Sequence, residues 1–134
     1  MAQITGKYEL VKSEYFAEHL VALGLPKDKA QDFENIRAIH EFTQNGDKIS
    51  FVFHVDPKYH SEFILGQEVE EIVEGGAIVK NSAYMDGNKL IVKSKLPDGK
   101  LATKIHTFSD TGLTLVFQVE DPAVPDAVRV FKRL

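Results

Sequence analysis

The chain has 134 residues, of which 43% are hydrophobic and 27% charged, as is ordinary for a soluble globular protein. This length suffices for a sizeable core, and we expect residues 1–134 to form a single domain. The formal net charge of -4 argues against a nucleic-acid-binding protein, and the lack of cysteine excludes disulfide bonds and thiolate chemistry. No apolar stretch resembles a signal peptide or reaches membrane-spanning length, so we expect a cytoplasmic protein.

The N-terminal part predicts one strand, at residues 5–11, followed by a helical hairpin within residues 13–36. Ser13 is expected to cap the first helix, because its hydroxyl can accept from free backbone N–H groups. Gly24 supplies a helix stop, and Pro26 suits the first turn of a second short helix. The side chains at helical spacing, which would form the packing faces, are Phe16, Leu20, Leu23, Ala30 and Phe33.

The remainder reads as a series of strands separated by turn signals. Asn45-Gly46 is a strong tight-hairpin signal, because both residues tolerate positive φ, and Asp86-Gly87-Asn88 is similar in kind. Regular spacing of this sort predicts antiparallel neighbours in either a sandwich or a barrel, and with the first strand the count is about ten. We expect an all-β fold, and the mixed inward faces described below favour the barrel: a ten-stranded antiparallel up-and-down β-barrel with a two-helix lid between its first and second strands. The later strands are predicted at residues 37–44, 48–55, 59–65, 67–74, 77–84, 89–95, 100–108, 113–119 and 126–133.

The last strand places a cation on a face that is otherwise apolar. Ala127, Arg129 and Phe131 share one parity of its period-two alternation. If this face points inward, Arg129 is a permanent cation inside the fold, which needs an anion from the chain or from a ligand. The alternative is a final strand whose Arg129 lies in solvent.

Other strands repeat this mixture of apolar and polar residues on one parity. A solid core would not tolerate so many unpaired polar groups, whereas a roomy barrel holding water and an amphipathic ligand would. The residues on these parities include Ala38, His40 and Phe42, then Phe51 and Phe53, then Lys104 and His106, and finally Leu115 and Phe117.

Each of these residues also has a plainer interpretation. His40 and His106 are compatible with ordinary half-buried histidines, and Lys104 with a side chain that reaches the barrel rim. Phe16 is compatible with simple packing. The five histidines show no tight metal-ligand spacing. Because no serine has a recognisable nucleophile context and no paired carboxylates share the inward parity, we expect neither an enzyme nor a metal site.

A set of short motifs is spread over nearly the whole chain: Gly6-Lys7-Tyr8-Glu9-Leu10, Ser13-Glu14-Tyr15-Phe16, Asn45-Gly46-Asp47, Phe63-Ile64-Leu65-Gly66 and Asp86-Gly87-Asn88-Lys89-Leu90. Together with the helical hairpin and the strand order, they resemble the intracellular fatty-acid-binding proteins, a family that includes the cellular retinoid-binding proteins. The resemblance implies a ten-stranded β-clam that carries one or two lipids without a cofactor and performs no chemistry.

The resemblance also implies where a ligand carboxylate would bind. The family often uses an Arg-x-Tyr pair on the last strand and a second Arg on an earlier one. Arg129 matches the first of these, whereas Phe131 stands in place of the Tyr and His106 in place of the second Arg. The resemblance therefore favours a long-chain fatty acid, with a retinoid or another lipid as the alternative, and a non-binding interaction scaffold as a further one. The residues expected to contact the ligand are Phe16, Leu20, Ala38, His40, Phe51, Phe53, Lys104, His106, Leu115, Phe117, Arg129 and Phe131.

Two further expectations follow from these residues. A free histidine titrates near about 6.5, and a bound carboxylate would raise the pKa of His106, so fatty-acid affinity would fall modestly between about pH 6 and pH 8. Lys27, Lys29 and Lys58 suggest a basic surface through which the helical lid of a monomeric carrier meets anionic membranes. A scatter of solvated charges explains these lysines equally well.

Overall fold

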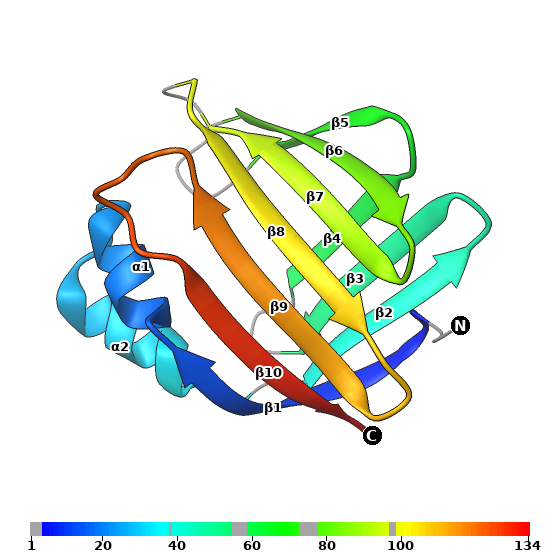
Figure 1. Cartoon of the computed structure of the whole chain (residues 1–134), viewed down its shortest axis with the longest axis horizontal. Helices are drawn as coiled ribbons and strands as arrows, with labels where there is room; N and C mark the ends of the chain where they lie inside the picture. Colours follow the sequence, from blue (N-terminus) through cyan, green and yellow to red (C-terminus); the bar gives the residue numbers. More distant parts are fainter. Residues whose placement is uncertain (1–3, 38, 55–58, 73–77, 97–98) are drawn as a thin grey trace.

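The structure is a computed structural model that describes residues 4–37, 39–54, 59–72, 78–96 and 99–134. Within these residues it forms ten strands and two helices (Figure 1). In chain order the elements are β1 (Gly6–Glu14), α1 (Phe16–Ala22), α2 (Lys27–Asn35), β2 (Ile39–Asn45), β3 (Lys48–His54), β4 (Tyr59–Ile64), β5 (Glu68–Ile72), β6 (Ile78–Asp86), β7 (Lys89–Lys95), β8 (Leu101–Phe108), β9 (Gly112–Val119) and β10 (Ala127–Arg133).

All ten strands belong to one antiparallel sheet that curls into a nearly closed barrel. Its order is β4-β3-β2-β1-β10-β9-β8-β7-β6-β5, so each strand pairs with the next along the chain except that β4 does not pair with β5. β1 pairs with β10, which joins the two ends of the chain, and β4 and β5 are the two edges of the sheet. The predicted up-and-down barrel is therefore confirmed.

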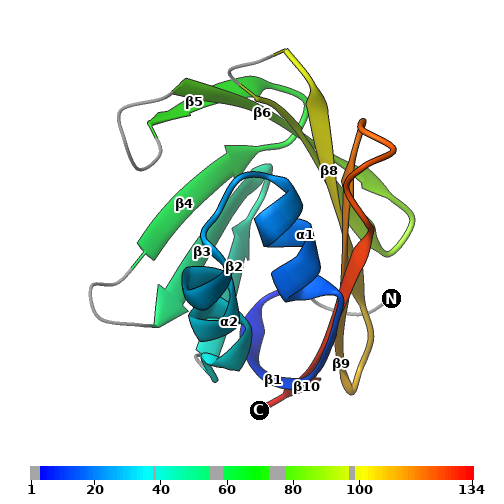
Figure 2. The same cartoon turned by 90° about the vertical axis from the view of Figure 1, so that its left-hand side faces the viewer.

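The two helices cover one open end of the barrel, in front of the strands in Figure 2. α1 and α2 pack against each other, and α1 also contacts β10. Ala30 is fully buried between them as predicted, but Phe33 remains 43% exposed. We call α1 and α2 the helical lid. Neither helix, within the described residues, is long and apolar enough to cross a membrane.

The boundary between β1 and α1 differs from the prediction. Ser13 does not cap the helix, because β1 continues to Glu14, whose backbone pairs with Val128 of β10. The chain turns at Tyr15 instead, in the left-handed conformation at φ 59° and without a side-chain cap. Pairing with β10 outweighs the local capping preference, which is worth about 1 kcal/mol.

The first tight hairpin is shifted by one residue from its predicted position. Asn45 pairs with Lys48, so Gly46 and Asp47 occupy the turn, and Gly46 carries the positive φ of 63°.

Gly112 is required for a different reason: a Cβ atom there would collide with the carbonyl oxygen of Phe131 on β10. Only glycine permits this close approach of β9 and β10.

The side chains that are packed most tightly lie at the end of the barrel away from the helical lid. Tyr8, Phe42 and Phe108 contact one another there through edge-to-face and tilted rings. The Tyr8 hydroxyl donates to the carbonyl of Ile4 at 2.8 Å, which satisfies its buried oxygen. This end of the barrel is a solid core, and the opposite end is not.

Candidate functional site

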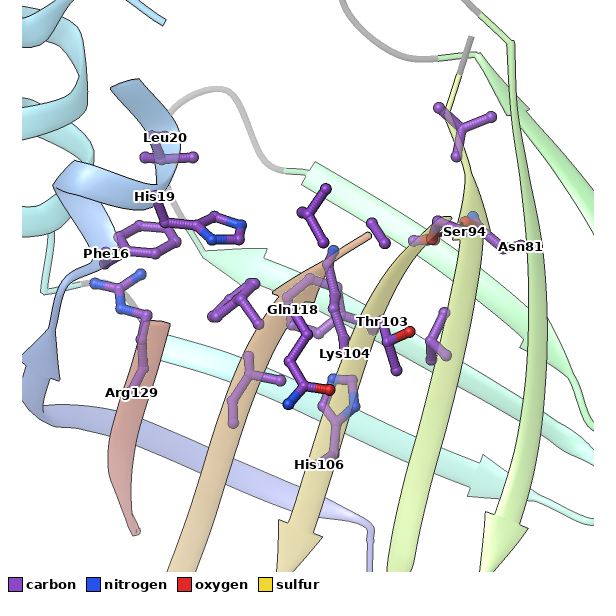
Figure 3. Close-up of a pocket in the computed structure, with 18 of the residues that line it drawn as sticks. Phe16, His19, Leu20, Asn81, Ser94, Thr103, Lys104, His106, Gln118 and Arg129 are labelled. Carbon is purple, nitrogen blue, oxygen red and sulfur yellow. Dashed lines mark hydrogen bonds between the residues drawn. The ribbon is translucent and has the colours of Figure 1, made fainter. Parts of the chain in front are cut away.

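A cavity of about 420 Å³ lies between the helical lid and the barrel strands. Its size is within the range of small-molecule sites, and its wall is mostly apolar (Figure 3). Ten of the twelve predicted contact residues line it: Phe16, Leu20, His40, Phe51, Phe53, Lys104, His106, Leu115, Phe117 and Arg129. Strand alternation brings these residues together, because each inward parity of β2, β3, β8, β9 and β10 faces the same space.

The other two predicted residues have different outcomes. Ala38 lies outside the described residues. Phe131 is buried in the core and does not line the cavity. Its ring lies 4.6 Å from the ring of His40, measured between centroids, so Phe131 supports the wall rather than forming it.

The sequence interpretation missed several lining residues, four of which are polar and buried: His19, Ser61, Asn81 and Ser94. Figure 3 shows Asn81 and Ser94 on the side of the cavity opposite Arg129, and the Ser94 hydroxyl donates to Asn81 Oδ1 at 2.6 Å. Their signal was present, since Asn81 and Ser94 each stand on an otherwise apolar parity of β6 and β7. The helical lid contributes His19, Leu23 and Phe33 as well.

Arg129 lies inside the cavity and not in solvent, with only 5% of its surface exposed. Its guanidinium carbon is 4.1 Å from the centre of the Phe16 ring on α1, as Figure 3 shows. Nη2 donates to the carbonyl of Glu34 at a long 3.4 Å, and the buried Nε has no hydrogen-bond partner among the described residues. Burial lowers the pKa of Arg129 to about 10, with a smaller contribution from Arg37 and an opposing one from Glu34, so the side chain stays charged at neutral pH.

The charge of Arg129 is not neutralised by an ion pair within the described residues. No Asp or Glu is among the described residues that line the cavity, whereas Lys104 is a second lining cation. The Lys104 ammonium lies 5.9 Å from the centre of the Phe117 ring. The interior is therefore apolar and positively charged, a combination that is unfavourable without an anion.

His106 and His40 are neutral in this interior. Burial, followed by the charge of Lys104, lowers the pKa of His106 to about 3, although a hydrogen bond to the Leu90 carbonyl opposes the shift. Burial, then Arg129, His106 and Lys104, lower the pKa of His40 to about 3. The expected fall in affinity between about pH 6 and pH 8 assumed a histidine that titrates near its free pKa. That assumption is wrong.

His19 joins the helical lid to the connection between β9 and β10. Its Nδ1 donates to the carbonyl of Pro125 at 2.8 Å, and its ring lies 5.9 Å from that of Phe117. Val124 of the same connection is buried. These contacts hold α1 over the cavity. Within the described residues, no group of three or more His, Asp or Glu side chains could hold a metal ion.

Comparison with known proteins agrees with this geometry. The model of the lipocalin / cytosolic fatty-acid binding protein family matches residues 1–110. The chain belongs to this family. The liver-type fatty acid-binding protein of Takifugu rubripes is 33% identical over 92 residues, which cover 68% of this chain and 74% of that protein. Gastrotropin of Bos taurus is 32% identical over 114 residues, which cover 78% and 88%.

The crystal structure of a fatty acid-binding protein from Drosophila melanogaster brain superimposes on this fold with a TM-score of 0.81. It is 29% identical and covers 94% of this chain and 95% of its own. The lipocalin / cytosolic fatty-acid binding family consists of carriers and not enzymes, which confirms the prediction that this chain is not an enzyme. In this chain Arg129 lies on β10, His106 is neutral, and Phe131 has no hydroxyl.

Proposed function

We propose that the protein binds a long-chain fatty acid non-covalently in the cavity, with the carboxylate on Arg129. The observation that carries this proposal is a buried guanidinium that has one long hydrogen bond and no ion pair in the described structure. A carboxylate would supply both the missing charge and the missing acceptors. Lys104, the other cation of the wall, adds to the attraction for an anion.

The rest of the cavity suits an acyl chain. Aromatic and aliphatic side chains make up most of the wall, and burying methylene groups against them is favourable by about 0.8 kcal/mol for each CH₂. The relatives from Takifugu rubripes and Drosophila melanogaster are named as fatty acid-binding proteins, which supports the same class of ligand. An interaction scaffold would be expected to have a filled barrel, and the cavity argues against it.

The protein would act as a monomeric cytoplasmic carrier that exchanges its ligand at membranes. Two observations favour the helical lid as the docking face. Leu23 and Phe33 line the cavity, yet they remain 45% and 43% exposed. Lys27 and Lys29 are exposed on α2 beside them, where they can attract anionic lipid head groups.

Arg129→Gln tests the proposed head-group site, because it keeps much of the side-chain shape and removes the charge. Loss of a charge-assisted contact should weaken binding of palmitate by about 1.5–3 kcal/mol. Binding of the matching fatty alcohol should change much less, since it has no carboxylate. Titration of both ligands into delipidated protein measures the two affinities. Arg133→Gln is the matched control, because it removes an arginine from the same strand outside the cavity.

Equal losses for the acid and the alcohol would mean that Arg129 does not hold a carboxylate. Competition between a fluorescent fatty acid and retinoids then addresses the ligand class. Retinoic acid would use the same cation, so displacement by retinol with an affinity above that of palmitate would favour the retinoid alternative.

A further inference from the structure

The hydrogen-bonding role of His106 is fixed by its backbone partner. Its Nδ1 lies 3.1 Å from the carbonyl oxygen of Leu90, and a carbonyl only accepts, so Nδ1 carries the proton. Burial and the charge of Lys104 keep the ring neutral. Nε2 is therefore a bare acceptor. Nε2 has no hydrogen-bond partner among the described residues. It is also not fully buried, and because His106 lines the cavity, Nε2 reaches the cavity.

His40 has the opposite arrangement. Its Nδ1 is buried without a partner, beside the rings of Phe51, Phe53 and Phe131 at 4.6–5.3 Å between centroids. A buried N–H that donates to nothing is rare, so the proton belongs on Nε2, which reaches the cavity. His40 thus presents a neutral donor. The two histidines border the same cavity, and they are close enough that a positive charge on His106 lowers the pKa of His40.

These two nitrogens lie deeper than the guanidinium of Arg129. Arg129 on β10 pairs with Leu115 on β9, and Leu115 pairs with His106 on β8. The backbones of Arg129 and His106 therefore lie at the same height in the barrel, two strands or about 10 Å apart. The Arg129 side chain reaches away toward Phe16 of the helical lid, while His106 packs against Phe42 and Phe108 of the solid core. A carboxylate bound to Arg129 leaves the histidines beside the middle of the acyl chain.

We propose that the preferred ligand carries a hydroxyl group along its chain, which donates to His106 Nε2 and accepts from His40 Nε2–H, directly or through one water. The protein is then a carrier of hydroxylated fatty acids, an inference that rests on the proposed fatty-acid function. A hydroxyl is the small group that both donates and accepts. A carboxylate at this position has nothing to donate to His106, and an amine would be repelled by Arg129 and Lys104. A plain methylene chain would leave both nitrogens without partners, which is unfavourable.

Binding measurements on the wild-type protein provide the first test. Palmitate, palmitate with a mid-chain hydroxyl and the methyl ether of that hydroxyl are titrated into delipidated protein. The hydroxylated acid should bind about tenfold more tightly than palmitate, the effect of one or two neutral hydrogen bonds. The ether accepts but cannot donate, so it should lose most of that gain. Equal affinities for palmitate and all positional hydroxy isomers would overturn the proposal.

Variants then assign the preference to the histidines. His106→Phe keeps a flat ring and removes the acceptor, and His40→Phe does the same for the donor. Each should reduce the ratio of the affinity for the hydroxylated acid to the affinity for palmitate toward one, whatever the change in palmitate binding itself. His60→Phe is the control, because His60 lies on β4 with its side chain 54% exposed. A preference that survives in both cavity variants would also overturn the proposal.

Nitrogen NMR of the histidine rings tests the premise without any variant or ligand. We expect two neutral rings between about pH 5 and pH 8, with His106 protonated on Nδ1 and His40 on Nε2. The same tautomer in both rings, or a charged ring at neutral pH, would contradict the inference. Failure of this NMR test leaves the Arg129 site intact, whereas equal losses of affinity for palmitate and its alcohol on Arg129→Gln are what contradict the fatty-acid function.

Discussion

Arg129 and Arg133 lie four residues apart on the same face of β10, yet their surroundings differ. Arg133 stacks on Tyr8 at 4.9 Å, and its two terminal nitrogens donate to the carbonyls of Thr5 and Ser109 at 3.0 and 3.1 Å. Arg129 also stacks on an aromatic ring, but it has a single long bond to a carbonyl. Among the described residues, the terminal nitrogens of Arg133 thus have two carbonyl acceptors, whereas those of Arg129 have one, at a long distance.

The difference extends to the two ends of the barrel. Around Arg133 the side chains are tightly packed, with Tyr8, Phe42 and Phe108 nearly or fully inaccessible. Around Arg129 there is a cavity with two cations and two neutral histidines. One end of the barrel stabilises the fold, whereas the other buries the charge of Arg129 with no ion pair among the described residues, a burial that is unfavourable without a ligand.

The largest expected effect is at the packed end. Phe108→Ala removes a ring that contacts Tyr8, Phe42 and His106, and should lower the free energy of unfolding by about 3–5 kcal/mol. Phe117→Ala should cost clearly less, because Phe117 already borders open space. Urea denaturation of the delipidated proteins measures both. Equal losses would show that the two ends of the barrel do not differ in packing.

Substitution of the two arginines should change the free energy of unfolding in different directions. Arg133→Met removes two hydrogen bonds to carbonyls and should lower the free energy of unfolding by about 1–2 kcal/mol. Arg129→Met removes a buried charge that lacks a counter-ion, so it should leave the ligand-free protein unchanged or stabilise it by about 1 kcal/mol. Thermal unfolding without lipid gives the comparison. A large destabilisation by Arg129→Met would mean that the contacts with Phe16 and Glu34 suffice for Arg129.

A smaller effect concerns pH. The pKa of His106 is about 3 in the folded protein, compared with an ordinary value of 6.5. Between pH 3 and pH 6.5, His106 is therefore protonated in the unfolded chain but neutral in the folded protein. Stability from this residue is fully present above pH 6.5 and decreases as pH falls toward 3. His106→Phe should remove about 1 kcal/mol of the loss between pH 6.5 and pH 5.5. Denaturation at both pH values measures it, with His60→Phe as control; parallel profiles for wild type and His106→Phe would indicate a histidine that titrates normally.

Much of the architecture could be predicted from local patterns. The alternation in β10 identified Arg129 as inward-facing, because strand geometry alone decides which residues share a face. Turn residues located most strand ends to within one or two positions. Ser13 failed because its local capping preference competed with pairing to β10, a strand that lies more than a hundred residues later in the sequence.

The chemistry of the site was harder to predict. The pKa of His106 depends on burial and on the approach of Lys104, and the role of its Nδ1 depends on the Leu90 carbonyl from the next strand. Phe131 has the inward parity of Arg129, but whether it touches a ligand depends on His40, which lies in front of it. Parity identifies the face on which a residue lies, and not its depth along the barrel.

The order of the strands has a consequence for how the chain folds. Every ladder joins consecutive strands except that of β1 with β10, whose partners, such as Tyr8 and Arg133, are separated by almost the whole chain. Loop closure over that distance is slow, so this ladder is expected to form late. Leu134 lies beside the start of β1, since its amide donates to the Lys7 carbonyl at 2.9 Å, while β4 and β5 share no ladder. Linking Leu134 to the start of β1 and opening the chain between β4 and β5 would preserve every ladder of the described sheet and turn the most distant pairing into a local hairpin.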